Sequence, residues 1–295
     1  MPGYCFTRKE KTMKTSKKNA LTTAAALIGA GIFISLGALF AMKFDFNKMN
    51  TLNIVTNTYT IDEAFTDIFV KGAECDILLR PSQDNKCSVI CRDGDKISHS
   101  VTVKNNTLTI QRTDNRKWYE CIGIYWGRME IIVYLPQAEY KALDIASVSG
   151  SIDIPDNFSF TEAKVSNTSG SVNFSAPVSG NLSVKTVSGS IKLDNIKCKN
   201  VTSKSTSGRI ALSDVTASDH MNIETVSGGI RLTKCDAGSL WLKSVSGNIT
   251  GSLLNQKTFV ANTVSGSINV PASAAGGRCE IKTTSGNISF EIEKP

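Results

Sequence analysis

The sequence predicts an all-β protein: a single-stranded parallel β-solenoid, or β-helix, of the right-handed type, with about 19 to 20 residues per coil and one transmembrane helix ahead of it. The first observation is a series of eight Ser-Gly dipeptides in the second half of the chain, spaced 19 or 20 residues apart. The second is the alternation of apolar and polar residues around each Gly, which is the period of a strand and not of an amphipathic helix. The eight glycines are Gly150, Gly170, Gly189, Gly208, Gly228, Gly247, Gly266 and Gly286.

Each repeat is expected to form a strand, a corner at Ser-Gly, and a second strand. In one copy Leu182 and Val184 precede Gly189, and Ile191 and Leu193 follow it. The apolar positions lie seven and five residues before the Gly but two and four residues after it, so an unbroken strand would not direct both sets inward. The corner must therefore absorb one residue, and Gly adopts the positive φ of such a corner without a steric penalty.

Stacking the coils predicts two columns of side chains along the axis. An inner apolar column forms because no coil can bury its own apolar face. A small polar residue three positions before each Gly is expected to hydrogen-bond along the axis as a structural ladder. The alternative is a row of hydroxyl groups presented to a glycan or an ice-like lattice. The inner column comprises Ile152, Val172, Ile191, Ile210, Ile230, Ile249, Ile268 and Ile288, and the polar column Ser147, Asn167, Thr186, Ser205, Thr225, Ser244, Thr263 and Thr283.

The N-terminal segments predict a membrane topology. Residues 20–42 carry no charge and are long enough to span a bilayer. Residues 1–19 form a basic tail that accounts for +5 of the net charge of +7, and the positive-inside rule keeps this tail in the cytoplasm. The C-terminal domain is then expected outside the cell membrane, as the ectodomain of a single-pass protein. A cleaved signal peptide is the alternative. The ectodomain carries only +2, which argues against nucleic acid as a partner.

Two parts follow the anchor. Residues 43–140 are predicted to be a β-rich N-terminal cap with degenerate coils, one of them around Gly72, and a hairpin that turns at Asn105 and Asn106. Residues 141–295 are the Ser-Gly solenoid. At its end, either the charges of Glu291, Glu293 and Lys294 shield the last strand, or another molecule docks there.

The cysteines show no disulfide framework of the small secreted kind. Cys235 and Cys279 occupy repeat positions that are apolar in other copies, so we expect buried free thiols. Cys87 and Cys91 lie four apart on one strand face and are a weak candidate for a metal or redox pair. Because a second pair and a His nearby in sequence are missing, no metal site is predicted.

Catalysis is not expected. The two histidines, His99 and His220, do not lie near a nucleophile motif, and the outward charges of successive coils do not form a column of acids. A Gly-rich phosphate loop that opens a helix is also missing. We therefore predict a protein without catalytic residues and without a cofactor.

An aromatic and basic cluster is the candidate partner-binding site. It consists of Trp118, Tyr119, Tyr125, Trp126 and Arg128. Exposed, these side chains would contact a carbohydrate or a membrane surface; buried, they would plug the end of the solenoid.

The repeat unit from Thr186 to Leu193, the segment 115–119 and the lead-in Tyr134-Leu135-Pro136 resemble a bacterial adhesin family with a β-strand repeat domain of unknown function. The resemblance covers about residues 52–295. It implies a membrane-anchored, non-enzymatic cell-surface or envelope protein, in families sometimes found near envelope-stress signalling systems. We expect binding to the cell wall, a glycan or a surface protein. A regulatory or scaffold ectodomain of an envelope-stress signalling complex is the first alternative. A glycan-active enzyme is the second, and it would need a pocket that joins at least two carboxylates.

Overall fold

The structure is a computed structural model that describes residues 22–24, 26–37, 40–41, 54–72, 74–94, 96–115, 117, 128–272 and 275–293. The chain separates into two units, Met1–Thr51 with Trp118–Trp126 and Leu52–Lys117 with Gly127–Pro295. In the first unit, residues 22–24, 26–37 and 40–41 are helical. Among the described residues, the structure contains no helix with the length and hydropathy needed to span a membrane, so it does not support the anchor predicted for residues 20–42.

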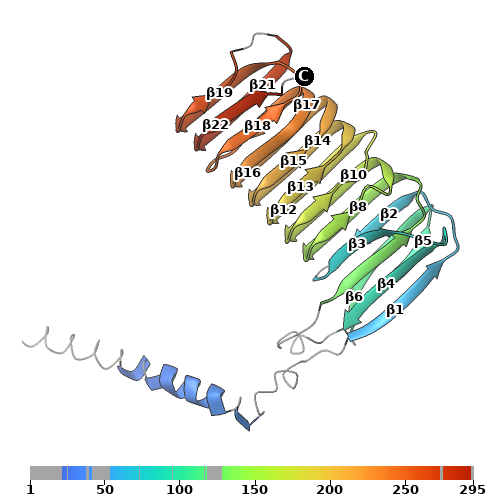
Figure 1. The fold of residues 1–295 in the computed structure, drawn as a ribbon. Coiled ribbons are helices and arrows are strands. Elements are labelled where there is room, and N and C mark those ends of the chain that lie inside the picture. Colours follow the sequence, from blue (N-terminus) through green and yellow to red (C-terminus); the bar gives the residue numbers. More distant parts are fainter. Residues whose placement is uncertain are drawn as a thin grey trace, which may run out of the picture. The chain divides into compact units, whose positions relative to one another are not determined.

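The second unit is an all-β solenoid of about seven turns with roughly 20 residues per turn (Figure 1). Its two sheets are here called the upstream sheet, made of the strands before each corner, and the downstream sheet, made of the strands after it. In spatial order the upstream sheet contains β5 (Ile97–Lys104), β6 (Thr107–Asp114), β2 (Asp67–Lys71), β8 (Glu139–Ser149), β10 (Ser159–Ser169), β12 (Asn181–Ser188), β14 (Lys197–Ser207), β16 (Thr216–Ser227), the second part of β17 (Ile230–Lys243), β21 (Gly277–Ser285) and β19 (Lys257–Ser265). The downstream sheet contains β1 (Ile54–Ile61), β4 (Cys87–Gly94), β7 (Glu130–Leu135), β3 (Asp76–Pro81), β9 (Ile152–Ile154), β11 (Val172–Phe174), β13 (Ile191–Asp194), β15 (Ile210–Ser213), the first part of β17, β18 (Ile249–Leu253), β22 (Ile288–Ile292) and β20 (Ile268–Asn269).

The coils stack in parallel and in register. Val184 pairs with Val165 in one neighbouring coil and with Ser203 in the other, so equivalent residues of successive coils face each other. The strand, corner, strand prediction is confirmed, and so is the hairpin: β5 and β6 pair antiparallel, and Asn105 and Asn106 have φ of 50° and 64°. The degenerate coil around Gly72 is formed by β2 and β3.

Seven of the eight corner glycines, all except Gly208, have the positive φ that was predicted for the corner, for example 112° at Gly150 and 118° at Gly170. The structure adds a second reason for Gly. A Cβ atom built on Gly170 would lie 2.7 Å from the carbonyl carbon of Gly150 and closer still to its oxygen. The corners of neighbouring coils therefore stack backbone on backbone, which leaves no space for a side chain.

The polar column is buried and forms the predicted ladder, but its partners differ from those expected. Asn167 Nδ2 donates to the carbonyl of Gly150 at 2.9 Å, and Thr283 Oγ1 donates to the carbonyl of Gly247 at 3.2 Å. Thr225 and Ser244 likewise donate to corner carbonyls of the adjacent coil, whereas Ser147 donates to the Ser149 carbonyl of its own coil. Among the described residues Thr186 Oγ1 and Ser205 Oγ have no hydrogen-bond partner, so the ladder is incomplete. Because this column is buried, it does not present hydroxyl groups to a ligand.

The chain does not stack its coils in sequence order at either end. At the N-terminal end, the coil of β2 and β3 lies between that of β8 and β9 and that of β6 and β7. The antiparallel strands β5 and β4 follow, and β1 lies beyond β4.

At the C-terminal end, the last coil in sequence, β21 with β22, is inserted between β17 with β18 and β19 with β20. Two predictions are corrected by this insertion. The last strand in sequence is internal, so Glu291 and Glu293 do not shield the end of the stack, and Lys294 lies outside the described residues. Ile268 belongs to the outermost coil and is 45% exposed, whereas the other members of the predicted inner column are buried.

Candidate binding face

The outer surface of the upstream sheet carries two rows of side chains that continue from coil to coil. The valine-threonine row lies two residues before each Gly and the lysine row four residues before it. In spatial order the first row is Val148, Thr168, Val187, Thr206, Val226, Val245, Thr284 and Val264; the second is Ala146, Ser166, Lys185, Lys204, Glu224, Lys243, Lys282 and Asn262. The valines of the first row are exposed although they are apolar: Val187 and Val226 are each 50% exposed. A column of exposed valines is a surface feature that requires an explanation.

A groove of about 560 Å³ runs between the two rows from Ser166 to Val245. One wall is apolar and the other is mainly basic, and the lining between them includes Asn167, Thr186, Ser205 and Thr225, whose side chains are almost completely buried. Within the basic wall Lys204 pairs with Glu224 at 2.7 Å. The groove spans several coils, so it suits an extended ligand better than a compact one.

The groove adjoins a second hollow on the same face, around Trp241. Lys243 belongs to the groove, and its Nζ lies 5.9 Å from the centroid of the Trp241 ring. The hollow measures about 280 Å³, and its lining includes His220, Asn222, Trp241, Arg278 and Glu280.

Polar contacts hold the residues around this ring. His220 Nδ1 lies 2.7 Å from Ser239 Oγ, and Arg278 Nη2 donates to Glu280 Oε2 at 2.8 Å. Hydrogen bonds from Lys282 and then Arg278 lower the pKa of Glu280. An aromatic ring surrounded by anchored polar groups is a suitable surface for a sugar ring.

Sequence reasoning missed Trp241, although a signal was present. The corresponding outward position holds no aromatic residue in the other coils; there it is Asp144, Lys164, Ser183, Thr202, Asn222, Glu280 and Val260, of which all but Val260 are polar. A tryptophan at an outward strand position among such residues is a candidate contact residue.

Of the predicted partner-binding residues, Trp118, Tyr119, Tyr125 and Trp126 lie outside the described residues. Arg128 is exposed and lines a different hollow of about 480 Å³ beside the Gly150 corner. The structure therefore does not bring Arg128 to the groove.

The hollow beside the Gly150 corner has the feature that a glycan-active enzyme would need, a pocket that joins at least two carboxylates. Its lining includes Glu74, Asp76, Glu130 and Asp153. Three of these carboxylates have structural partners. Arg80 Nη1 lies 2.6 Å from Asp153 Oδ2, Arg92 Nη1 lies 3.2 Å from Glu130 Oε2, and the Ser151 N–H donates to Asp76 Oδ1 at 2.7 Å. Paired carboxylates of this kind hold strands together and do not by themselves make an acid and base pair.

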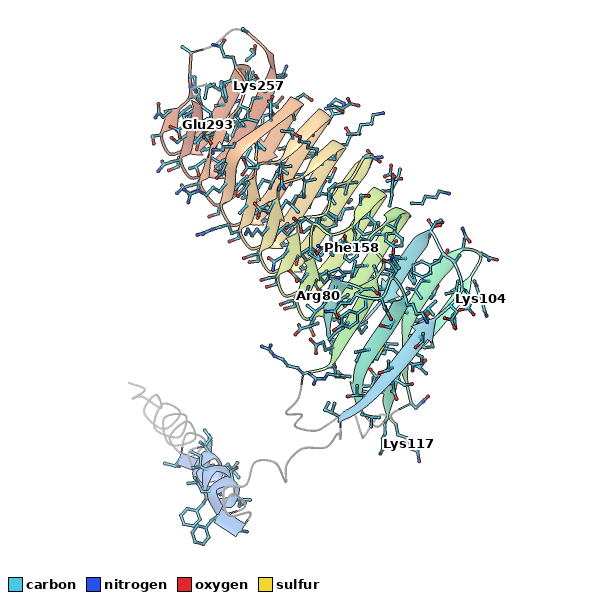
Figure 2. All side chains as sticks on the ribbon, turned by 45° about the vertical axis from the view of Figure 1, so that its right-hand side comes forward. Arg80, Lys104, Lys117, Phe158, Lys257 and Glu293 are labelled. Carbon is cyan, nitrogen blue, oxygen red and sulfur yellow. The ribbon has the colours of Figure 1, made fainter. Side chains whose placement is uncertain are left out.

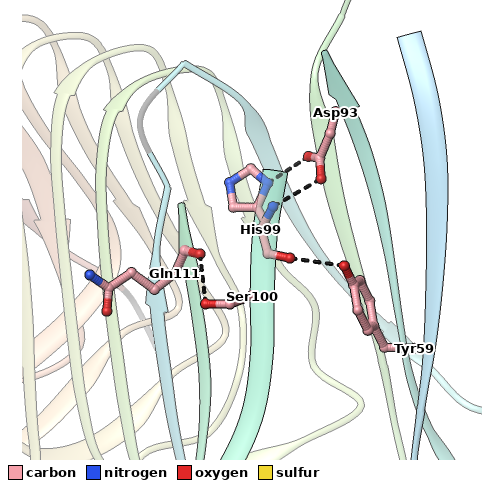
Figure 3. A network of polar contacts seen from close by, with 5 residues as sticks. All are labelled: Tyr59, Asp93, His99, Ser100 and Gln111. Carbon is pink, nitrogen blue, oxygen red and sulfur yellow. Dashed lines mark hydrogen bonds and ion pairs between the residues drawn. The ribbon is translucent and has the colours of Figure 1, made fainter. Parts of the chain in front are cut away.

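A buried polar network closes the N-terminal end of the core, as Figure 3 shows. Asp93 Oδ1 lies 2.6 Å from His99 Nδ1, Asp93 Oδ2 accepts from the His99 N–H at 3.0 Å, and Tyr59 donates to the His99 carbonyl at 2.9 Å. Tyr59 comes from β1 in one sheet and His99 from β5 in the other, so the network ties the two sheets together.

Cys91, Asp93 and His99 place three potential metal ligands within 4.8 Å of one another. The cluster forms where β4 of the downstream sheet and β5 of the upstream sheet face each other, and sequence spacing did not reveal it. Burial, with smaller contributions from Asp93 and Cys75, raises the pKa of the Cys91 thiol to about 12. A metal ion on His99 Nδ1 would displace the hydrogen bond to Asp93. It would not provide a partner for the buried His99 Nε2, which has none among the described residues. We therefore interpret the cluster as a structural closure.

Cys235 and Cys279 are buried free thiols, as predicted, and so is Cys198. Cys87 and Cys91 are likewise buried free thiols. Burial raises the pKa of Cys87 to about 12, so this thiol is not a reactive thiolate at neutral pH.

The fold and this outer face define a parallel β-solenoid protein with an extended, partly apolar and partly basic surface groove. The chain belongs to the Toastrack DUF4097 family, whose model matches residues 65–294 and which is a domain of unknown function. The resemblance to an adhesin-like family with a β-strand repeat domain, noted from the sequence, is confirmed.

Several solved structures match the chain. A putative lipid binding protein from Parabacteroides distasonis is 19% identical, with a TM-score of 0.50 and coverage of 80% of this chain and 95% of the other. A putative adhesin from Bacteroides fragilis is 18% identical, with a TM-score of 0.48 and coverage of 81% and 97%. At such identities the likeness concerns the fold alone. A search of curated proteins found no match.

Proposed function

We propose that this protein is a non-enzymatic surface or envelope protein that binds an extended cell-wall polymer along the outer face of the upstream sheet. The observation that carries the proposal is the continuity of the groove. Its two walls repeat at the spacing of the coils, about 4.8 Å, from Ser166 to Val245. A ligand that extends along the axis would meet the same chemistry several times, so weak contacts would add up.

The chemistry of the walls favours a glycan with anionic groups. The valine-threonine row offers apolar contact for sugar ring faces, and Trp241 offers a stacking surface. Lys185 and Lys243 stand along the other wall and would attract carboxylate or phosphate groups of the polymer. The membrane anchor at residues 20–42, a cytoplasmic tail and an external domain are part of the proposal, because they would place this face toward the cell wall.

The test measures retention of the purified full-length protein on insoluble cell wall and on a glycan array. Trp241→Ala is expected to weaken retention about tenfold, which corresponds to about 1.4 kcal/mol. Tyr134→Ala is the matched control, because Tyr134 points outward from the opposite sheet on β7. Absence of retention of the unmodified protein, or equal retention of the Trp241 variant, would contradict the proposal.

A second experiment separates charge from stacking. Replacing Lys185, Lys204 and Lys243 together by alanine is expected to abolish binding to anionic polymers and to spare neutral ones. If binding to both kinds falls equally, the lysine row does not select an anionic ligand.

A regulatory or scaffold ectodomain is the second candidate function. The end of the stack formed by β19 and β20 favours it, because this end leaves apolar side chains exposed, Val264 at 84% and Ile268 at 45%. Such a surface offers apolar contact to a protein partner.

A further inference from the structure

A buried lysine, Lys257, lies in the outermost C-terminal coil. It is the first residue of β19, and Figure 2 shows it near the C-terminal end of the solenoid. Its side chain is only 6% exposed, and among the described residues no other lysine or arginine is buried. Lysine side chains are rarely buried unless a partner holds the amine.

The amine of Lys257 and its partner carboxylate are held by several hydrogen bonds. Lys257 Nζ lies 2.6 Å from Asp236 Oδ1 and donates to the Ala237 carbonyl at 2.6 Å. The Asp236 side chain is itself only 16% exposed. Its Oδ1 also accepts from the Ala237 N–H at 2.9 Å, and its Oδ2 accepts from Asn255 Nδ2. Both reacting groups of a possible condensation are therefore fixed next to each other.

The Lys257 side chain passes a complete coil to reach Asp236. Lys257 pairs with Gly277 of β21, and β21 lies between β19 and β17, which carries Asp236. A Cβ atom built on Gly277 would lie 3.7 Å from Lys257 Nζ, so the lysine passes this coil directly beside a residue without a side chain. The contact thus connects two coils that are not neighbours and spans the inserted last coil.

We propose that Lys257 and Asp236 form an intramolecular isopeptide bond, an amide between Nζ and Cγ that the folded chain makes without a cofactor. A proton passes from Nζ to Oδ1 along the 2.6 Å contact, and the electron pair that it leaves on Nζ attacks Cγ. The bond between Cγ and Oδ1 then breaks. Oδ1 leaves as water with that proton and a second one from Nζ, and Oδ2 becomes the amide oxygen.

The surroundings of the pair favour this condensation. Asn255 Nδ2 donates to Oδ2, the oxygen on which negative charge develops when the amine attacks. The Ala237 carbonyl accepts from Nζ and holds the amine beside the carboxylate. Groups fixed in this way react as if at an effective concentration of up to about 10⁵ to 10⁸ M, which offsets the preference of free amines and acids in water to stay separate. Burial also keeps away the water that would reverse the reaction.

A second pair in the same chain has the distance but not the burial. Lys204 Nζ lies 2.7 Å from Glu224 Oε1, and these side chains are 42% and 26% exposed. Water competes for both groups at such a site. We therefore expect Lys204 to keep a free amine, which makes it a control within the same molecule.

The amide would join the coils on both sides of β21 by a covalent bond. β21 supplies Arg278 and Glu280 to the hollow around Trp241, so the bond would preserve the lining of this hollow. The inference does not depend on the proposed polymer binding, because it is tested by mass and not by retention on a ligand.

The first test is the intact mass of the purified full-length protein, unfolded under reducing conditions so that disulfides do not contribute. We expect the protein without substitutions to be lighter than its sequence by one water. Lys257→Met and Asp236→Ala are each expected to have the full mass of their sequences, whereas Lys204→Met is expected to keep the loss of water. A loss of stability would not distinguish an ion pair from an amide, so mass is the measurement that decides.

The second test locates the bond by digestion with trypsin. An acylated lysine is not cleaved, so residues 244–278 are expected to remain one peptide, joined through the amide to residues 235–243. Cleavage after Lys204 is expected to be normal. Three results would overturn the proposal: the full sequence mass in the protein without substitutions, a loss of water that persists in Lys257→Met, or a loss of ammonia, which would place the bond on Asn255.

Discussion

Substitution of one corner glycine, Gly170→Ala, tests how the coils are held together. The Cβ atom of alanine would lie 2.7 Å from the carbonyl carbon of Gly150 and closer to its oxygen, and that carbonyl also accepts the 2.9 Å hydrogen bond of Asn167. The obstacle is backbone and not a flexible side chain. Relief therefore requires a shift of two coils relative to each other.

The loss in the free energy of unfolding that Gly170→Ala should cause has two contributions. Placing a non-glycine residue at a φ of 118° costs about 1 to 3 kcal/mol. Overpacking against a fixed backbone costs a further 1 to 3 kcal/mol or so. We therefore expect Gly170→Ala to lower the free energy of unfolding by about 2 to 6 kcal/mol.

The assay is urea unfolding followed by circular dichroism, with Gly229→Ser as the control. Gly229 directly follows a corner glycine, at a position where Ser190 stands in another coil, and a Cβ atom built on it would lie 3.3 Å from its nearest obstacle, the Asn248 carbonyl oxygen. The control is expected to change the free energy by less than about 1 kcal/mol. A loss below about 1 kcal/mol in Gly170→Ala, or equal losses in both variants, would refute the stacking argument.

Two further predictions concern buried ionisable groups. Burial raises the pKa of several thiols from 9.0 to about 12, so the unfolded chain releases protons above pH 9 while the folded chain keeps them, and stability falls by about 1.4 kcal/mol per thiol and pH unit above pH 9. Unfolding at pH 8 and pH 10 measures this, Cys198→Ala should reduce the slope, and stability that does not change with pH would exclude the mechanism. Lys257→Met should cost about 3 kcal/mol with little dependence on salt, because the Lys257 and Asp236 side chains are only 6% and 16% exposed. Lys164→Met, in the exposed pair with Asp144, should cost less than about 1 kcal/mol, and similar losses in the two variants would contradict the difference in burial.

The repeat could be read from the sequence because each coil obeys the same local rules. The alternation of apolar and polar residues around Gly189 determines which side chains face inward. The apolar positions change from odd distances before the Gly to even distances after it, which requires a corner at the Gly. Leu182, Val184, Ile191 and Leu193 are buried as predicted. Both arguments use only neighbouring residues, so no long-range information was needed.

The candidate binding face could be predicted only in part. The outward rows follow from the register of the coils, but their meaning depends on which outward side chains become neighbours. Trp241 and Lys243 are two residues apart, yet Arg278 and Glu280 reach the same hollow only because β21 is inserted beside β17. The aromatic cluster near Trp118, which stands out in the sequence, lies outside the described residues.

The sequence by itself determined the parallel coil, the corner glycines, the buried polar column and the unpaired thiols, because each depends on a pattern within one repeat. Only the tertiary structure decided the order of the coils. The order of the coils at each end of the solenoid depends on which strands form the more stable pairing. This pairing involves strands far apart in sequence. Both β2 and β21 are enclosed by strands that do not adjoin them in the chain. That long-range pairing leaves the coil of β19 and β20 at the C-terminal end of the stack.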